Sequence, residues 1–337
     1  MPSTLSDLIL NSPHAIPMTI GVYAGLEIIN ARVMDAVTSA QVQTEAILAL
    51  HEHLETEILM TAMDLSVEAE LFGCQIKLAE DEIPTVIGRK ITSAKAIEGM
   101  PIPAPNSGRA RVQLKTVENL VRASDKPVLG CMIGPFSLAG RLFGFTEVME
   151  LSITEPDALE RLLDKVSRFL AEYALAFRNS GAAGVIMAEP AAGLLSPRGL
   201  AQFSAKYIRA ISEQTANHGF TILYHNCGAR LVHLEKILEA GLEIYHFSSP
   251  MDILNALSMV EDRIILSGNL DPAAVFLAGT PETVRTKTRD LMAQTADHPN
   301  FVIASGCDIP PYTPLANLEA FYQAVRSFPQ RGFSKGQ

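Results

Sequence analysis

The sequence predicts a (β/α)8 barrel, an α/β fold of the TIM type. Eight short apolar runs alternate with longer amphipathic segments along most of the chain. Repeated strand and helix patterns of this kind favour parallel strands covered by helices, and eight such units favour a barrel. The 337 residues, 48% of them hydrophobic and 19% charged, suffice to bury its core. We therefore expect a single barrel domain over residues 1–337.

The expected strands are the apolar runs, which are rich in branched side chains and bounded by turn residues or charges. In chain order they are residues 16–22, 58–64, 127–134, 184–189, 220–225, 243–248, 263–269 and 301–305. Between them, apolar residues recur at helical spacing. The clearest helical segments are residues 155–179, 197–218, 231–240, 280–296 and 317–327.

Two regions depart from the regular alternation. Residues 26–54 read as helical and form an N-terminal extension that covers the bottom of the barrel or its start. Residues 73–106 follow the second strand and are predicted to form an inserted flap beside the barrel mouth. Apolar and polar residues alternate in 73–78 and 83–86, as in a β-hairpin, and 100–105 are rich in proline, as in an extended connector.

Composition excludes several classes of partner. The net charge is −10, Lys and Arg form no dense cluster and Trp is absent, so we expect no nucleic-acid binding. The apolar runs end well short of the ~20 residues that cross a bilayer, and the N-terminus lacks a signal-peptide pattern, so we expect a cytoplasmic protein that does not enter a membrane. Four cysteines without short paired spacing suit reduced thiols.

Three side chains predict a metal site. His225 and Cys227 stand two residues apart at the end of an expected strand, so they point the same way, and Cys307 follows another strand. One imidazole and two thiolates favour zinc, and three protein ligands leave the fourth tetrahedral position open, as catalytic zinc requires. The alternative is that the cysteines are small buried hydrophobic residues.

The barrel prediction strengthens the metal prediction, because active sites of this fold lie where strands end and loops begin. Several polar or thiol side chains fall at such ends: Asp64, Glu189, His225, Cys227, His246 and Cys307. A strand-end cluster is therefore expected without any assumption about a metal.

Five motifs carry a resemblance to a known family. They are VLGCMIGPFSLAG at 128–140, MAEP at 187–190, HNCG at 225–228, SGNLDP at 267–272 and SGCDIPPYTP at 305–314. Together they resemble the uroporphyrinogen decarboxylase superfamily and, within it, the zinc-dependent methylcobamide:coenzyme M methyltransferase branch. The resemblance implies a zinc enzyme on a (β/α)8 barrel, with His225, Cys227 and Cys307 as metal ligands.

The chain also departs from the decarboxylases of that superfamily. Their arginine-rich N-terminal motif grips substrate carboxylates, whereas residues 20–26 contain no arginine here. Asp64 stands where those enzymes have a strand-end aspartate, but its context, MDLSVEAE, looks more like the methyltransferases. Related methionine synthases use a glutamate as a further zinc ligand. The matching position in this chain falls near Ser248 and His246, and neither residue is a glutamate. The fourth zinc ligand is therefore left as one of three alternatives: water, a neighbouring carboxylate or the sulfur of the substrate.

The chemistry that fits is thiol methylation, because zinc deprotonates a thiol and leaves its sulfur reactive. The methyl group would come from a corrinoid, on a corrinoid protein, and go to a small thiol such as coenzyme M, or move between the corrinoid and another methylated small molecule. The alternatives are a decarboxylase acting on a porphyrinogen and a non-catalytic module that docks the corrinoid protein.

Six further residues are site candidates, each with an ordinary structural alternative. Asp64, Glu189 and Asp308 are candidate catalytic carboxylates, although each could instead stabilise a turn or cap a loop. The remaining candidates, which could contact the corrinoid or line the mouth but could also simply pack, are Met132, Asn269 and Tyr312.

Overall fold

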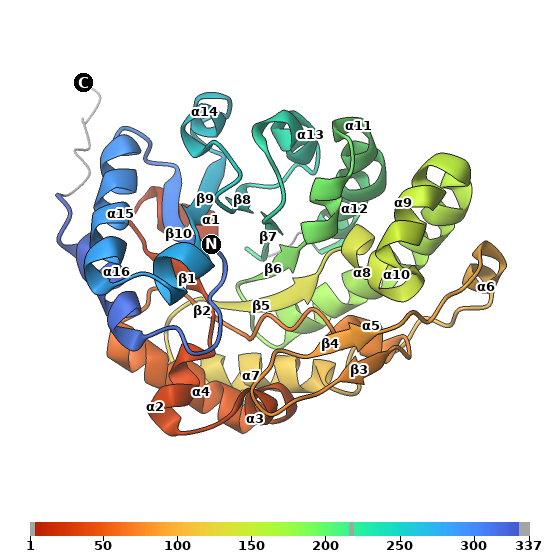
Figure 1. Ribbon diagram of the computed structural model, residues 1–337, viewed down its shortest axis with the longest axis horizontal. Helices are drawn as coiled ribbons and strands as arrows, with labels where there is room; N and C mark the ends of the chain where they lie inside the picture. Colours follow the sequence, from red (N-terminus) through yellow and green to blue (C-terminus); the bar gives the residue numbers. More distant parts are fainter. Residues whose placement is uncertain (1–3, 216–218, 330–337) are drawn as a thin grey trace.

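The computed structural model describes residues 4–215 and 219–329, and within them eight parallel strands form a nearly closed barrel (Figure 1). The strands hydrogen-bond in the order β1, β10, β9, β8, β7, β6, β5, β2. Their bounds are β1 (Met18–Ile20), β2 (Leu59–Met60), β5 (Val128–Ile133), β6 (Gly184–Ala188), β7 (Thr221–Asn226), β8 (Ile244–Phe247), β9 (Ile265–Leu270) and β10 (Phe301–Asp308). Each falls on one of the eight expected strands, so the TIM-type fold is confirmed.

The predicted flap contains a two-stranded antiparallel hairpin that follows β2. Its strands are β3 (Gln75–Lys77) and β4 (Thr85–Ile87), and the short helix α6 (Ala94–Glu98) comes after them. In Figure 1 this segment projects beside the barrel, as the hairpin pattern predicted.

Helices surround the strands. They are α1 (Leu5–Leu10), α2 (Ala24–Ile29), α3 (Val33–Thr38), α4 (Ala40–Leu54), α5 (Val67–Leu71), α7 (Ala110–Ala123), α8 (Pro135–Phe143), α9 (Phe145–Thr154), α10 (Pro156–Asn179), α11 (Pro197–Leu200), α12 (Lys206–Thr215), α13 (Leu234–Leu238), α14 (Ile253–Ser258), α15 (Pro281–Gln294) and α16 (Leu315–Arg326). Between them lie the 3-10 helices η1 (Pro190–Leu194) and η3 (Leu231–His233) and the π-helices η2 (Ala201–Ala205) and η4 (Pro272–Leu277). The expected helices are confirmed, except that residues 216–218 of the segment 197–218 lie outside the described part.

The helical stretch predicted at 26–54 is three helices rather than one. Asn30 adopts a left-handed conformation with φ of 51° and ends α2. Ser39 then begins α4, because its hydroxyl accepts a hydrogen bond from the backbone N–H of Val42 at 3.3 Å. Local cap residues therefore divide a segment whose apolar spacing alone looked continuous.

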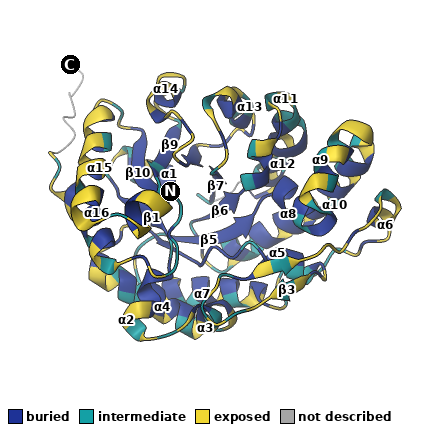
Figure 2. Cartoon of the chain, in the orientation of Figure 1, coloured by how far each residue is buried: buried dark blue, intermediate teal, exposed yellow. Residues whose placement is uncertain are grey.

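Helix α1 closes the bottom of the barrel. Its Leu5 and Ile9 belong to one cluster with the apolar side chains that fill the barrel interior, such as Leu223 and Val302. A larger cluster lies between the strands and the surrounding helices. Figure 2 shows the same division, with buried strands at the centre and exposed positions on the outer faces of the helices. In the described residues, no helix is both long and apolar enough to span a bilayer.

Candidate metal centre at the barrel mouth

The fold brings the three predicted ligands together. His225 lies near the end of β7 and Cys227 follows the strand directly, while Cys307 lies near the end of β10. Strands β8 and β9 separate β7 from β10 in the barrel wall. Nevertheless the imidazole and thiol ligand atoms of the three residues lie within 4.8 Å of one another. This convergence at the carboxyl ends of the strands is where the fold places active sites.

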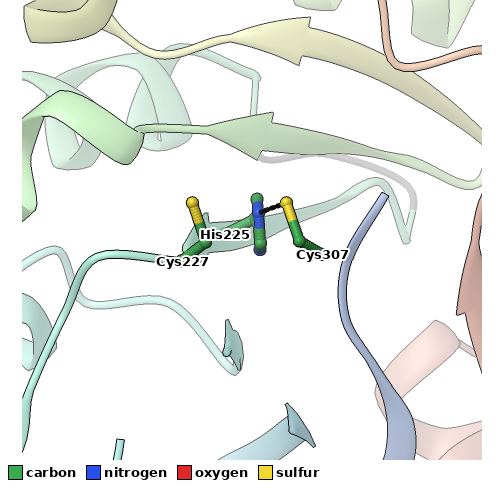
Figure 3. Close-up of side chains that lie close together, drawn as sticks. All are labelled: His225, Cys227 and Cys307. Atoms are coloured by element: carbon green, nitrogen blue, oxygen red, sulfur yellow. Dashed lines mark hydrogen bonds between the residues drawn. The ribbon is translucent and has the colours of Figure 1, made fainter. Parts of the chain in front are cut away.

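The geometry of the three side chains suits a soft metal ion. Figure 3 shows the imidazole of His225 with the two cysteine side chains beside it, and Nε2 of His225 is 3.4 Å from Sγ of Cys307. Ligand atoms of a tetrahedral zinc site stand roughly 3.5–3.8 Å apart, given zinc–sulfur and zinc–nitrogen bonds of about 2.3 and 2.0 Å. Small side-chain adjustments would bring the three atoms to that spacing.

The two thiols also have the electrostatics of a metal site. The Cys307 thiol is a hydrogen-bond partner of Cys227, and with the nearby His225 it lowers the pKa of Cys227 to about 4, against the desolvation caused by burial. The same interaction raises the pKa of Cys307. The arrangement therefore favours a thiolate at Cys227, and a divalent cation would favour loss of the second proton.

A second histidine fixes the orientation of the first. His246 on β8 is paired in register with His225 on β7, and their Nδ1 atoms are 2.8 Å apart. Burial, followed by the nearby His225, lowers the pKa of His246, so its ring is neutral. If Nε2 of His225 binds the metal, its Nδ1 carries the proton and donates to Nδ1 of His246. His246 is thus a positioning residue.

We expect His246→Phe to weaken zinc binding by about 10–100-fold, the usual effect of losing an outer-shell partner of a metal-binding histidine. The ring would no longer accept the proton on Nδ1 of His225. Competition with a chromogenic zinc chelator measures the affinity. The matched control is Tyr245→Phe on the same strand, whose hydroxyl interacts instead with Leu242 and Leu238. Equal affinity in both variants would contradict a positioning role for His246.

Glu189 is occupied by other contacts. Its carboxylate accepts hydrogen bonds from the backbone N–H groups of Phe136 at 2.7 Å and Ser137 at 2.8 Å, at the start of α8, and from the Ser204 hydroxyl at 3.0 Å. A carboxylate in this position satisfies the free N–H groups of the helix and favours its dipole. Burial raises the pKa of Glu189 to about 6. The contacts favour a structural role, and its predicted catalytic role stays a prediction.

Asp64 forms a buried ion pair. Its side chain is fully buried and pairs with Arg109, and its Oδ1 accepts a hydrogen bond from the Ser66 hydroxyl at 2.5 Å. Asp308, which follows Cys307 on β10, differs: Oδ1 is buried and has no hydrogen-bond partner in the described residues. Burial raises the pKa of Asp308 well above its ordinary value. Both carboxylates remain candidates for direct contact with a substrate.

The three residues predicted to contact a corrinoid lie in different settings. Met132 lies on β5 and is buried in the larger apolar cluster, between the strands and the surrounding helices. Asn269 donates a hydrogen bond to the backbone carbonyl of Met251 at 2.8 Å, so it ties β9 to the loop after β8. Tyr312 is 68% exposed after β10. Exposure favours a contact role for Tyr312 and burial disfavours one for Met132, and all three roles stay predictions.

With this geometry established, a comparison with protein families gives one match. The profile of the uroporphyrinogen decarboxylase (URO-D) family matches residues 15–328. The chain belongs to the URO-D family. This result confirms the resemblance inferred from the motifs.

Curated URO-D relatives carry two kinds of name. The methylcobamide:CoM methyltransferase MtbA of Methanosarcina mazei is 30% identical over 283 residues, which cover 82% of each chain. A uroporphyrinogen decarboxylase of Pseudoalteromonas atlantica is 26% identical over 313 residues, covering 88% of this chain and 85% of the relative. The family therefore includes methyltransferases and decarboxylases.

Solved structures agree with the barrel. A methyltransferase from Methanosarcina mazei superposes with a TM-score of 0.86 at 25% identity, covering 96% of this chain and 98% of the other. A B12-independent methionine synthase from Shewanella sp. W3-18-1 has a TM-score of 0.53 at 14% identity, and the match covers 85% of this chain and 88% of the synthase. This similarity shows the shared fold alone.

Proposed function

We propose that the protein is a zinc-dependent methyltransferase that moves a methyl group between a corrinoid and a small thiol. The observation that carries the proposal is the convergence of His225, Cys227 and Cys307 within 4.8 Å at the barrel mouth. The name of the MtbA relative, a methylcobamide:CoM methyltransferase, supports the same reaction class. So does a relative at 24% identity named methylated-thiol–coenzyme M methyltransferase, also from Methanosarcina mazei.

Each residue of the centre has a defined task in this proposal. Zinc bound by the two thiolates and the imidazole would lower the pKa of a substrate thiol and hold its sulfur as a nucleophile. His246 holds the His225 ring in the orientation that presents Nε2 to the metal. The lowered pKa of Cys227 favours the thiolate form that binds zinc. The corrinoid would be presented by a separate corrinoid protein, which we propose as the partner.

A decarboxylase is the second candidate, because relatives with that name align over most of the chain. A porphyrinogen carries many carboxylates, which need cations. Here residues 20–26, where decarboxylases carry arginines, contain none, and Tyr23 in that stretch lies close enough to Asp308 and Asp64 for their charges to raise its pKa. The scarcity of cations thus favours the methyltransferase over the decarboxylase.

The deciding experiment combines zinc analysis with a methyl-transfer assay. Protein purified without a polyhistidine tag is expected to contain about one zinc per chain. With an added thiol it should convert methylcobalamin to cob(I)alamin, while the thiol loses its proton and becomes the methyl thioether. Zinc without turnover in the presence of several thiols would favour a docking module. Well-folded protein that takes up no zinc would remove the basis of the proposal.

A further inference from the structure

A second group of polar side chains lies at the barrel mouth, and we name it the acid cluster: Tyr23, Asp64, Glu68, Arg109 and Asp308. Glu68 belongs to α5 and is only 1% exposed. Its Oε1 accepts a hydrogen bond from the backbone N–H of Ile133 at 2.9 Å, whereas Oε2 has no partner among the described residues. A buried carboxylate oxygen without a donor is costly, so its retention calls for an explanation.

Two further members have unpartnered buried atoms. Neither the Tyr23 hydroxyl, in a residue that is 3% exposed, nor Oδ1 of Asp308 has a hydrogen-bond partner within the described ranges. The members lie close together: Oδ1 of Asp308 is 3.4 Å from the position of a Cβ on Gly21, two residues before Tyr23, and Glu68 follows Asp64 by four residues. Consistent with this, burial and the charge of Asp64 raise the pKa of both Tyr23 and Glu68. Three buried oxygens without a hydrogen-bond partner thus come from three different parts of the described chain: Tyr23 before α2, Glu68 on α5 and Asp308 on β10.

Two arginines lie near the carboxylates of the acid cluster, and within the described residues only Arg109 is bound to one of them. Arg109 is committed through Nη1 to Asp64, through Nε to Glu70 at 2.6 Å and through Nη2 to the Ser66 hydroxyl at 2.9 Å. Burial lowers the pKa of Arg141, and the nearby Asp64 opposes that shift. The Arg141 guanidinium lies over the Phe145 ring, 5.4 Å from its centroid, and its buried Nε has no hydrogen-bond partner among the described residues. The three carboxylates of the acid cluster, together with Glu70, therefore outnumber these two guanidinium groups.

The acid cluster adjoins the metal centre, because Asp308 and Cys307 are consecutive residues of β10. We propose that the acid cluster binds a positively charged group, such as an ammonium, at the end of the substrate opposite its thiol. This inference rests on the proposed methyltransferase function. An ammonium would supply the N–H donors that the free oxygens lack and offset their charge, whereas a sulfonate would meet only further negative charge.

Three two-carbon thiols test this directly: 2-aminoethanethiol, 2-mercaptoethanol and 2-mercaptoethanesulfonate, which end in a cation, a neutral hydroxyl and an anion. With methylcobalamin as donor and zinc-loaded protein, we expect kcat/KM to fall in that order, by at least about 10-fold from first to last. Glu68→Gln should reduce this ratio several-fold, because it keeps the acceptor for Ile133 but removes the charge. The control is Glu82→Gln, on an exposed hairpin carboxylate paired with Lys77. Equal rates, or preference for the sulfonate, would overturn the inference and leave the methyltransferase proposal intact.

A second measurement does not depend on zinc or turnover. Ethylammonium and ethanesulfonate are titrated into metal-free protein, with binding followed by ligand-observed NMR. We expect ethylammonium alone to bind, and Glu68→Gln to weaken its binding several-fold with an unchanged melting temperature. Such binding without methylation of any thiol would uphold the acid cluster as a cation site while the proposed function failed. No binding of ethylammonium to folded protein would overturn the cation site itself.

Discussion

Replacement of Cys307 by serine is expected to remove the bound zinc and to lower thiol methylation by roughly 10³-fold. A free thiol with a pKa near 8.5 is only about 3% ionised at pH 7, so losing the deprotonated form alone costs about 30-fold. Loss of the positioned sulfur adds to that, because a metal that orients and activates a nucleophile contributes several kcal/mol. Elemental analysis and initial rates with methylcobalamin measure both effects.

The pH dependence distinguishes loss of activation from general damage. In the Cys307→Ser variant the residual rate should rise with pH towards the pKa of the free thiol, whereas the zinc-loaded protein should show little rise over that range. Cys74→Ser is the matched control, because Cys74 is a buried thiol in the core outside the barrel and lies apart from the three ligands. A Cys307→Ser protein with full zinc and full rate would refute the assignment of Cys307 as a ligand.

The barrel was predictable because its strands are buried on both faces. Runs such as Val128–Ile133 and Gly184–Ala188 are fully buried, so they read as short apolar stretches between helical patterns. What the pattern could not give is the division of residues 26–54, since the left-handed Asn30 depends on backbone geometry that apolar spacing does not report. Apolar runs also overestimate strand length: the expected strand at 58–64 contains only the short β2 (Leu59–Met60).

The convergence of the three proposed metal ligands was predictable for a different reason. His225 and Cys227 share one short motif, and strand-end placement by the barrel brings Cys307 to them. The sequence identifies His246 only as a strand-end histidine, because its hydrogen bond to His225 depends on the register between β7 and β8. That register could have been inferred by aligning the ends of the two predicted strands.

The acid cluster was largely invisible in the sequence. Arg109 lies 45 residues after Asp64, at the start of α7, which is not among the helices expected from the sequence. Glu68 has the pattern of an ordinary charged residue in an amphipathic turn. Only the folded chain buries both and leaves one oxygen of Glu68 without a donor among the described residues. Sequence patterns identify residue types that make strong ligands, but they do not report which common residues lose contact with water.

Replacement of Arg109 by methionine is expected to destabilise the protein by about 3–5 kcal/mol. The Asp64 side chain is fully buried and Arg109 is 8% exposed, so removal of the guanidinium would leave an uncompensated charge near Glu68, which is itself buried. Protonation of Asp64 sets an upper limit to the cost, because a neutral carboxylic acid is easier to bury. Urea unfolding at neutral pH, followed by circular dichroism, gives the free energy of unfolding.

A double variant separates the pair itself from the rest of Arg109. Asp64→Asn combined with Arg109→Met should cost less than the sum of the two single changes by at least about 1 kcal/mol, because neither charge then remains alone. Arg89→Met is the surface control: its ion pair with Glu147 is about 40% exposed on the Arg89 side, and such pairs contribute about 0–1 kcal/mol. Two results would contradict this expectation: strict additivity in the double variant, or an Arg109→Met effect no larger than that of Arg89→Met. Either would mean that water reaches Asp64. The mouth of the barrel would then not be the low-dielectric site on which the acid cluster depends.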